Sequence, residues 1–413
     1  MPITAKKESI MNILLSSYSG SPYKGSEDAV GWNWITTLSK KLPNDTVYFV
    51  TRTFNKEDLD KGLKEFQIKN VKAIYVDVPN ALDWYREKYK PFHYMQYMIW
   101  LQVVYRWAKK SKIKFDIVHH ITMGNFRITG SINKLDAVSI FGPVGGGQTT
   151  PSSLKCYYNK KSRFEKIRDI ANDLVPKMPS YKRSLRRFDK VFAVNEETKQ
   201  IMEKSAGIKV VRLPEIAINK DLVMLDVEPR HNETIEIIYL GRLLELKGLT
   251  LLIDVIKEVK SDKSFHFSLY GSGELEEELK RKIKEYAIED IVCVPGEIDY
   301  TQIADVYKNA DIFVHPTFRD SGGAVFVEAM AYKLPIVALN QSLSRELNDN
   351  KCGLFVETNQ AKEEIIQEFA QKLKALIENE ELRLELGENG YNYANGFLTL
   401  DKKFDIIYGD IIG

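Results

Sequence analysis

The sequence predicts an α/β protein made of two Rossmann-like domains, each built on a parallel β-sheet. Short runs rich in Val, Ile, Phe and Tyr alternate with longer stretches of helical character, which argues for parallel sheets covered on both faces. The alternation starts afresh at residue 235, after a turn-rich segment at 211–233 that we interpret as the domain junction. Glycine-containing turns follow several predicted strands. The length of 413 residues favours two or three domains.

The first domain is expected at 11–212, after an N-terminal extension at 1–10. Helices are expected at 28–42, in the charged segment that precedes residue 71, and directly after residue 195. A long aromatic segment occupies 82–110. The strand at 190–195 is expected to be the last of this half. The predicted strands are 11–17, 46–51, 71–78, 115–121, 137–142 and 190–195.

The second domain is expected at 213–396. Its helices should alternate with strands until two final helices at about 361–396, and the terminal residues 397–413 are apolar enough to dock on a domain. The predicted strands are 235–241, 265–273, 291–296, 311–317, 336–340 and 352–357, and the helices between them are 249–261, 275–287, 300–310 and 324–333.

Composition excludes several classes of protein. Apolar residues make up 44% of the chain, which is ordinary for a globular protein, and no run of 18 apolar residues predicts a membrane span. Three widely spaced cysteines without a metal-ligand pattern favour a reducing compartment, and the first ten residues lack the apolar core of a secretion signal. We therefore expect a cytoplasmic protein.

Charge is unevenly distributed, although the formal net charge is only +2. The segment 155–190 carries 12 Lys and Arg against 4 Asp and Glu. Together with the aromatic and basic segment 84–110, it suggests contact with an anionic membrane surface on the inner face of the membrane. A core helix and a solvated helical face are the alternatives for these two segments. Nothing predicts a nucleic-acid partner.

Two strand-to-helix turns of the second domain carry charged side chains. Arg242 and Lys247 follow the strand at 235–241, and Asp320 and Glu328 flank the turn after 311–317, where Gly322 and Gly323 precede a helix. Cations can hold a diphosphate, carboxylates can hold sugar hydroxyls, and a helix start offers free N–H groups. Glu328 lies in the otherwise apolar run VFVEAMA, where an unpaired charge is costly.

These residues give the chain a resemblance to the retaining glycosyltransferases of family four. Members of that family carry two acids separated by seven residues and followed by Ala-Met-Ala, and here Asp320, Glu328 and Ala329–Ala331 have that spacing. The first acid is an aspartate where glutamate is usual. The resemblance covers about residues 11–395 and implies the GT-B fold, in which two Rossmann-like domains face a central cleft. It also implies that residues 397–413 form a helix that returns to the first domain.

The resemblance implies roles for individual residues. Arg242 and Lys247 would stabilise the leaving diphosphate, Asp320 would orient the donor sugar, and Glu328 would bind the nucleotide ribose. His120 would lie near the outer hydroxyls of the donor sugar, because only one of the adjacent His119 and His120 can face the cleft. Further donor contacts would come from Gly25, Ser26, Gly271, Gly273, Glu297, Ser321, Gly322, Gly323 and Ala324.

Three residues of the first domain are weaker candidates on the acceptor side. Glu27 could contact the acceptor or cap a helix. Gly145 and Gly146, in the cluster GPVGGGQ, could admit a substrate or simply turn the chain. A buried, hydrogen-bonded core residue is the alternative for His120, and an ordinary turn is the alternative for Glu297.

The expected reaction moves a hexosyl unit from a UDP- or GDP-sugar to a hydroxyl of a glycan, glycolipid or protein-linked acceptor, with retention and without a metal or cofactor. The sequence contains no Asp-x-Asp motif at a suitable strand end and no Gly-Lys-Ser/Thr phosphate loop. A GT-B sugar-nucleotide epimerase and a catalytically silent sugar-nucleotide-binding subunit are the alternatives. Product analysis without an acceptor would distinguish the first, and donor binding without transfer would indicate the second.

Overall fold

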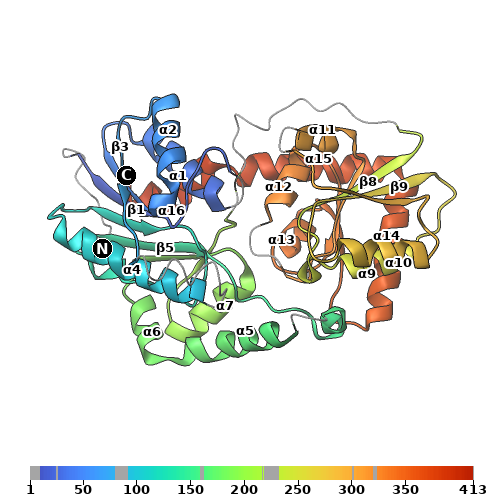
Figure 1. Cartoon of the computed structure of the whole chain (residues 1–413), viewed down its shortest axis with the longest axis horizontal. Coiled ribbons are helices and arrows are strands. Elements are labelled where there is room, and N and C mark those ends of the chain that lie inside the picture. The colour runs from blue at the N-terminus through green and yellow to red at the C-terminus, as the bar shows by residue number, and fades with distance from the viewer. Residues whose placement is uncertain are drawn as a thin grey trace. The chain divides into compact units, whose positions relative to one another are not determined.

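The computed structural model describes residues 10–24, 27–79, 92–158, 162–215, 217, 232–299, 302–319 and 323–412. The chain divides into two compact units. The first comprises residues 1–147, 171–215 and 400–413, and the second comprises 148–170 and 216–399. Each unit contains one parallel sheet (Figure 1).

The sheet of the first unit has seven strands in the order β3-β2-β1-β4-β5-β6-β7. Its central strand β4 is buried at every position, as expected for a parallel strand covered on both faces. The segment that we expected to be the domain junction adds one more strand, β7, so β6 is not the last strand of this sheet. The strands are β1 (Asn12–Ser16), β2 (Thr46–Thr51), β3 (Val71–Tyr75), β4 (Ile117–His120), β5 (Val138–Val144), β6 (Lys190–Ala193) and β7 (Val211–Arg212).

Two apolar cores cover the two faces of this sheet. One core contains Trp34 from α1 and Tyr408 from α16. The other contains Trp100 from α4, Leu185 from α6 and Met202 from α7. In Figure 1 the red helix α16 lies beside the blue helix α1. The helices are α1 (Glu27–Lys41), α2 (Lys56–Glu65), α4 (Phe92–Lys110), α6 (Pro179–Leu185), α7 (Glu196–Ala206) and α16 (Leu400–Ile412).

The sheet of the second unit has six strands in the order β10-β9-β8-β11-β12-β13. This is the order of a doubly wound sheet, whose direction of winding reverses beside the first strand, here between β8 and β11. The strands are β8 (Ile235–Leu240), β9 (Phe265–Tyr270), β10 (Val292–Gly296), β11 (Ile312–His315), β12 (Ile336–Leu339) and β13 (Gly353–Val356).

Helices again cover both faces. Helices α9, α10 and α14 share one core with β8 and β9, and α11, α12 and α15 pack on the other face with Ile238 and Phe313 (Figure 1). The bounds are α9 (Leu249–Glu258), α10 (Glu276–Glu285), α11 (Ile303–Asn309), α12 (Ala324–Ala331), α13 (Leu343–Asp349), α14 (Lys362–Glu378) and α15 (Glu380–Phe397).

One boundary expectation is wrong. We placed all of 11–212 in the first domain, but residues 148–170 belong to the second unit. Leu154 and Tyr158 are buried in the core of the second sheet, and the hydroxyl of Tyr157 donates a hydrogen bond of 2.8 Å to Asp254. These contacts join residues about 100 positions apart, which local sequence patterns do not reveal. The division falls within helix α5 (Ser162–Leu174), after Ile170.

Candidate active site

Four loops meet at the carboxyl edge of the second sheet, where parallel α/β sheets bind their ligands. They follow β8, β9, β10 and β11, which are neighbours in the sheet. The predicted residues Arg242 and Lys247 lie in the first of these loops, Gly271 and Gly273 in the second, and Glu297 in the third. The structure therefore gathers these five residues at one edge.

Backbone hydrogen bonds lock these loops to one another. Leu243 N donates to Ser272 O at 2.9 Å, and Leu275 N donates to Leu243 O at 3.1 Å. On the other side, Phe318 N donates to Leu246 O at 3.0 Å. The main chain around the predicted cations is thus fixed from both neighbouring loops, and a fixed frame is what a preorganised binding site requires.

Glycines make this close packing possible. Gly248 has φ +70°, and a Cβ there would lie 2.1 Å from Pro316 O. A Cβ at Gly271 would lie 1.9 Å from Gly241 O, and one at Gly273 would lie 2.3 Å from Leu243 O. At these positions the absence of a side chain lets the backbones of neighbouring loops pack against each other. The donor contacts predicted for Gly271 and Gly273 are therefore not required to explain these two glycines.

The two cations differ in exposure. Arg242 is exposed directly after β8, and Lys247 is partly buried at the end of a short 3₁₀ turn, Glu245–Lys247. The exposed guanidinium of Arg242 can bind an anion from solvent without first moving out of a buried position. Both side chains carry the charge that a diphosphate needs.

The loop after β11 is anchored by an ion pair that sequence reasoning missed. Arg319 binds Glu165 of α5 in a bidentate manner, with Nε–Oε2 2.9 Å and Nη2–Oε1 2.6 Å. The side chains are 17% and 8% exposed. The pair joins residues 154 positions apart and fixes the main chain immediately before Asp320. No local motif marks such a pair.

The acidic part of the predicted site is described only from Gly323 onward. Asp320, Ser321 and Gly322 lie outside the described residues. Gly323 has φ +65° and directly precedes α12, of which Ala324 is the first residue.

Glu328 is held inside α12 by a buried phenol, which sequence reasoning also missed. The hydroxyl of Tyr307 on α11 donates to Glu328 Oε2 at 2.9 Å. Burial raises the pKa of Glu328, and the hydrogen bond from Tyr307 opposes that effect. The partner explains how a carboxyl group is tolerated in this apolar helix.

Glu297 lies on the exposed loop after β10. Its Oε2 accepts a hydrogen bond of 3.0 Å from Ser272 Oγ, which belongs to the loop after β9. Gly271 N also donates to Gly296 O at 2.8 Å. The turn that carries Glu297 is therefore tied to the glycine loop, as a nucleotide contact at this edge would need.

In the first unit, Glu27 begins α1, whereas Gly25 and Ser26 lie outside the described residues. Burial raises the pKa of Glu27 to about 7, the charge of Asp28 adds to the shift, and the main-chain N–H of Met123 opposes it. A carboxyl group that titrates near neutral pH is unusual, and perturbed groups are enriched in functional sites.

The two adjacent histidines point to opposite faces of the first sheet, as strand alternation predicts. His119 bonds the hydroxyl of Tyr408 and the carbonyl of Gly142, each at 2.6 Å. His120 bonds the hydroxyl of Tyr97 and, at 3.1 Å, Ser16 Oγ.

Both imidazoles are buried and neutral at pH 7. Burial lowers the pKa of His119 to about 4 and that of His120 to about 3. Protein hydroxyls bond both ring nitrogens of His120, so contact with a sugar would require one of these bonds to exchange. The alternative of a hydrogen-bonded core residue describes His120 as it stands in the structure.

Gly145 and Gly146 serve the chain turn after β5. Gly145 O accepts from Phe126 N at 3.0 Å, and Gly146 O accepts from Asn172 Nδ2 at 3.1 Å. Gly146 has φ +101°, a conformation that favours glycine. These contacts support the turn-forming role that we left open from the sequence.

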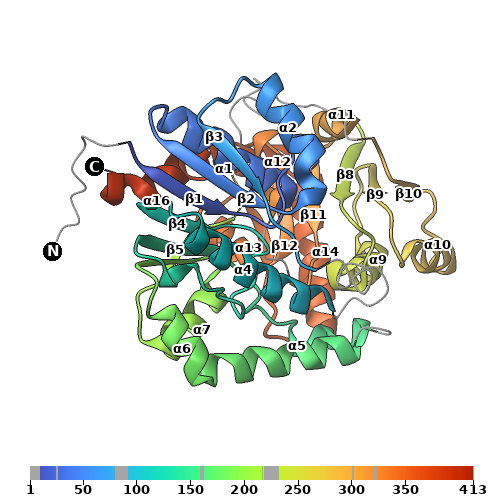
Figure 2. The ribbon, with the colours of Figure 1, turned by 60° about the vertical axis from the view of Figure 1, so that its left-hand side comes forward.

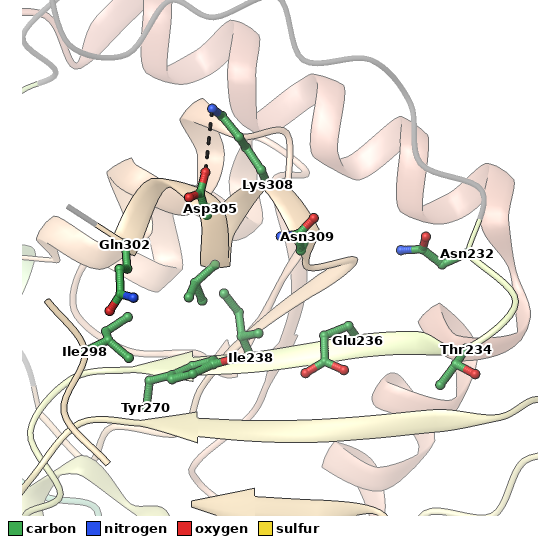
Figure 3. Close-up of a pocket in the computed structure, with 11 residues that line it drawn as sticks. Asn232, Thr234, Glu236, Ile238, Tyr270, Ile298, Gln302, Asp305, Lys308 and Asn309 are labelled. Atoms are coloured by element: carbon green, nitrogen blue, oxygen red, sulfur yellow. Dashed lines mark ion pairs between the residues drawn. The ribbon is translucent and has the colours of Figure 1, made fainter. Parts of the chain in front are cut away.

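A separate pocket of about 750 Å³ lies over the face of the second sheet, beside α11. Figure 3 shows Glu236 and Tyr270 on the strand side and Asp305, Lys308 and Asn309 on the helix side. Lys308 Nζ lies 4.0 Å from Asp305. Among its described lining residues, carboxylates outnumber cations, so this pocket is unsuited to a diphosphate.

Within the described ranges, His, Cys, Asp and Glu side chains form no group of three or more that could hold a metal ion. No helix in the same ranges has the length and apolar content that crossing a bilayer requires. The aromatic helix α4 packs Tyr97, Trp100 and Val104 into the core. The described part of segment 84–110 is therefore mainly a core helix.

Solved structures share this architecture. The chain superimposes on Anabaena HepE, crystallised in complex with UDP, with a TM-score of 0.59 at 14% identity, covering 97% of this chain and 99% of HepE. The two parallel-sheet Rossmann-like units make the fold GT-B, as the sequence predicted.

Sequence comparison adds a family match in the second unit. Residues 225–393, which lie in the second unit, match the family described as glycosyl transferases group 1. Over 210 residues the chain is 25% identical to the uncharacterized glycosyltransferase MJ1178 of Methanocaldococcus jannaschii, covering 51% of this chain and 55% of that protein. It is 30% identical over 163 residues to the capsular polysaccharide biosynthesis glycosyltransferase CapM of Staphylococcus aureus, covering 38% and 41%. The matches thus span about half of these relatives or less.

Proposed function

We propose that this protein is a retaining glycosyltransferase that moves a hexosyl unit from a UDP- or GDP-sugar to a hydroxyl acceptor. The observation that carries the proposal is the set of interlocked loops at the carboxyl edge of the second sheet. They hold Arg242, Lys247 and Glu297 on one frame with the main chain that leads to Asp320. The match of residues 225–393 to the group 1 family and the similarity of the fold to that of HepE, crystallised with UDP, support it.

In the proposed reaction the bond from the anomeric carbon to the donor phosphate oxygen breaks, and a bond to the acceptor oxygen forms on the same face. The acceptor proton passes to an oxygen of the leaving diphosphate, so no strong protein base is needed. Arg242 and Lys247 stabilise the charge that develops on that diphosphate. Asp320 orients the donor sugar, and Glu328 binds the nucleotide ribose. No metal ion takes part in the proposed mechanism.

The acceptor is proposed to be a glycan or a lipid-linked sugar. CapM is named for capsular polysaccharide biosynthesis, which is assembly of this class of product. A lipid-linked acceptor would bring the enzyme to a membrane surface. We propose that the protein acts in the cytoplasm, on the inner face of that membrane.

Donor binding and transfer test separate parts of the proposal. Thermal-shift screening against UDP, GDP and their sugars should show stabilisation by one nucleotide class, of about 2.7 kcal/mol when the ligand is at 100 times its dissociation constant. Arg242→Ala and Lys247→Ala should each lower the transfer rate about 100-fold or more, with an unchanged melting temperature.

Arg281→Ala is the matched control, because Arg281 is 67% exposed on α10 and pairs with Glu285 of the same helix. It should leave binding and transfer unchanged. Near-normal transfer by both site variants would refute the assignment of the diphosphate site. Conversion of the donor to an epimer without an acceptor would instead indicate the epimerase.

A further inference from the structure

Helix α5 buries its polar face and exposes its apolar face, the reverse of an ordinary surface helix. Its buried positions are polar: Glu165, Arg168 and Asn172 are 6%, 8% and 5% exposed. Its exposed positions carry large apolar side chains at helical spacing, and Met178 extends the same series beyond the helix. The apolar residues are Phe164 (50% exposed), Ile167 (65%), Ile170 (55%), Leu174 (57%) and Met178 (49%). A surface helix normally turns its apolar stripe toward the core.

Specific contacts hold the polar side of α5 inward. Glu165 forms the bidentate pair with Arg319, and Arg168 Nη2 donates to Gln148 O at 2.7 Å. In the last turn, Asn172 Nδ2 donates to Gly146 O at 3.1 Å, while its Oδ1 accepts from Arg127 Nη1 at 2.6 Å. Rotating the helix to bury the apolar stripe would break these buried polar contacts, so the outward orientation is fixed.

Cations flank the apolar stripe. Arg163 and Lys166 are exposed on α5 itself. Beyond the helix, a hollow of about 400 Å³ is lined only by cations and one proline among the described residues: Lys177, Pro179, Lys182, Arg183, Arg186 and Arg187. Besides the buried Glu165, the acids of α5 are Asp169, which pairs with Lys155 at 3.1 Å, and Asp173, which is exposed.

We infer that α5 and the following residues through Arg187 form a surface that docks on a lipid bilayer carrying anionic headgroups. Figure 2 shows α5 from the side, with its green ribbon visible over its full length. The apolar stripe enters the boundary between headgroups and acyl chains, and the flanking cations meet lipid phosphates. None of these residues is a proposed donor contact, and Glu165, which pairs with Arg319 beside Asp320, is on the buried side of the helix.

Charge selects the bilayer over a second copy of this chain. The segment 155–190 carries 12 cationic against 4 acidic residues, so two copies of this face would repel each other at close range. An anionic bilayer satisfies the apolar stripe and the cations together. The inference also places the surface on α5 and α6 and not on the aromatic helix α4, whose large rings are core residues.

Flotation of the full-length protein with lipid vesicles tests this surface. At low salt the protein should float with vesicles containing about 30% phosphatidylglycerol and should not float with pure phosphatidylcholine vesicles, and high salt should weaken binding. The variant Ile167→Gln/Leu174→Gln should bind at least 10-fold more weakly, because two apolar anchors are lost. Arg183→Gln/Arg187→Gln should bind about 10- to 30-fold more weakly.

Matched controls come from other exposed helix positions. Ile406→Gln on α16 (47% exposed) and Arg281→Gln on α10 should bind like the unmodified protein. All substitutions lie at exposed positions, so an unchanged melting temperature and an unchanged thermal shift with UDP or GDP should accompany them. That readout separates failure of membrane docking from failure of the proposed donor site.

Three results would overturn the inference. The first is no flotation with anionic vesicles at low salt, and the second is equal flotation by Ile167→Gln/Leu174→Gln. The third is a dimer in sedimentation that this variant dissociates while flotation stays unchanged, which would assign the stripe to a second copy of the chain.

Discussion

The ion pair between Glu165 and Arg319 gives a sharp test of how the loop before Asp320 is held. Both side chains are largely buried, and two short hydrogen bonds join them. Glu165→Met removes the negative charge at similar volume and leaves the guanidinium of Arg319 buried without it. Removal of one partner of a buried pair costs about 3–5 kcal/mol. For a unit of roughly 150–250 residues this lowers the melting temperature by about 6–20 °C.

Rescue distinguishes the charge from the packing. Glu165→Met/Arg319→Met replaces the pair by apolar side chains and should recover most of the lost stability, because a buried ion pair and a packed apolar pair often have similar stability. Glu285→Met, in the exposed pair with Arg281, is the control and should change stability by less than about 0.5 kcal/mol.

The chain carries a convenient internal probe. All five tryptophans lie between residues 32 and 107, in the first unit, so their fluorescence reports that unit alone. In Glu165→Met, calorimetry and circular dichroism should show unfolding of the second unit at a lower temperature. Tryptophan fluorescence monitors the unfolding of the first unit separately. A midpoint within 2 °C of the unmodified protein, or a double variant no more stable than Glu165→Met, would refute the reasoning.

Two further outcomes are expected. Gly248→Ala should destabilise the second unit by clearly more than Gly207→Ala destabilises the first: both glycines have φ near +65°, but a Cβ at Gly248 meets Pro316 O whereas one at Gly207 meets nothing within 4 Å. Gly207→Ala should therefore cost about 1 kcal/mol from its backbone conformation alone, and equal losses in urea unfolding would contradict the packing argument. For Glu27, the folded pKa of about 7 lies above the ordinary 4.5, so the folded state binds more protons between these values and stability should fall as pH rises through this window. Glu27→Gln should remove up to about 3 kcal/mol of that pH dependence. The variant should gain stability relative to the unmodified protein above pH 7 and should show no such gain below about pH 5. Melting temperatures of the two proteins that change in parallel from pH 4.5 to 8 would exclude a raised pKa.

Much of the fold follows from local pattern. The strands at 46–51 and 235–240 are nearly continuous apolar runs, as buried parallel strands must be, and they were predicted within one residue. The grouping of Arg242 with Gly271 could also be predicted, because ends of neighbouring parallel strands share an edge.

Other parts of the site are invisible in the sequence. Tyr307 reads as one more aromatic residue of a helix, yet its hydroxyl holds Glu328. Gly271 and Gly273 suggest ligand contact, yet backbone atoms of the neighbouring loop already fill the space beside them. A local pattern records the kind of side chain but not its distant partner.

The sequence by itself determined the alternation of strands and helices, the break between two sheets and the order of the charged turns, because hydrophobic periodicity and turn chemistry act over a few residues. Only the tertiary structure decided that 148–170 belong to the second unit, that His120 bonds two protein hydroxyls, and that α5 turns its apolar face outward. Each of these depends on contacts between residues far apart in the chain, apolar for Leu154 and Tyr158 and polar for His120 and α5. The free energy of such a contact depends on which distant residues the fold brings together, and the local sequence around each residue does not specify its partner.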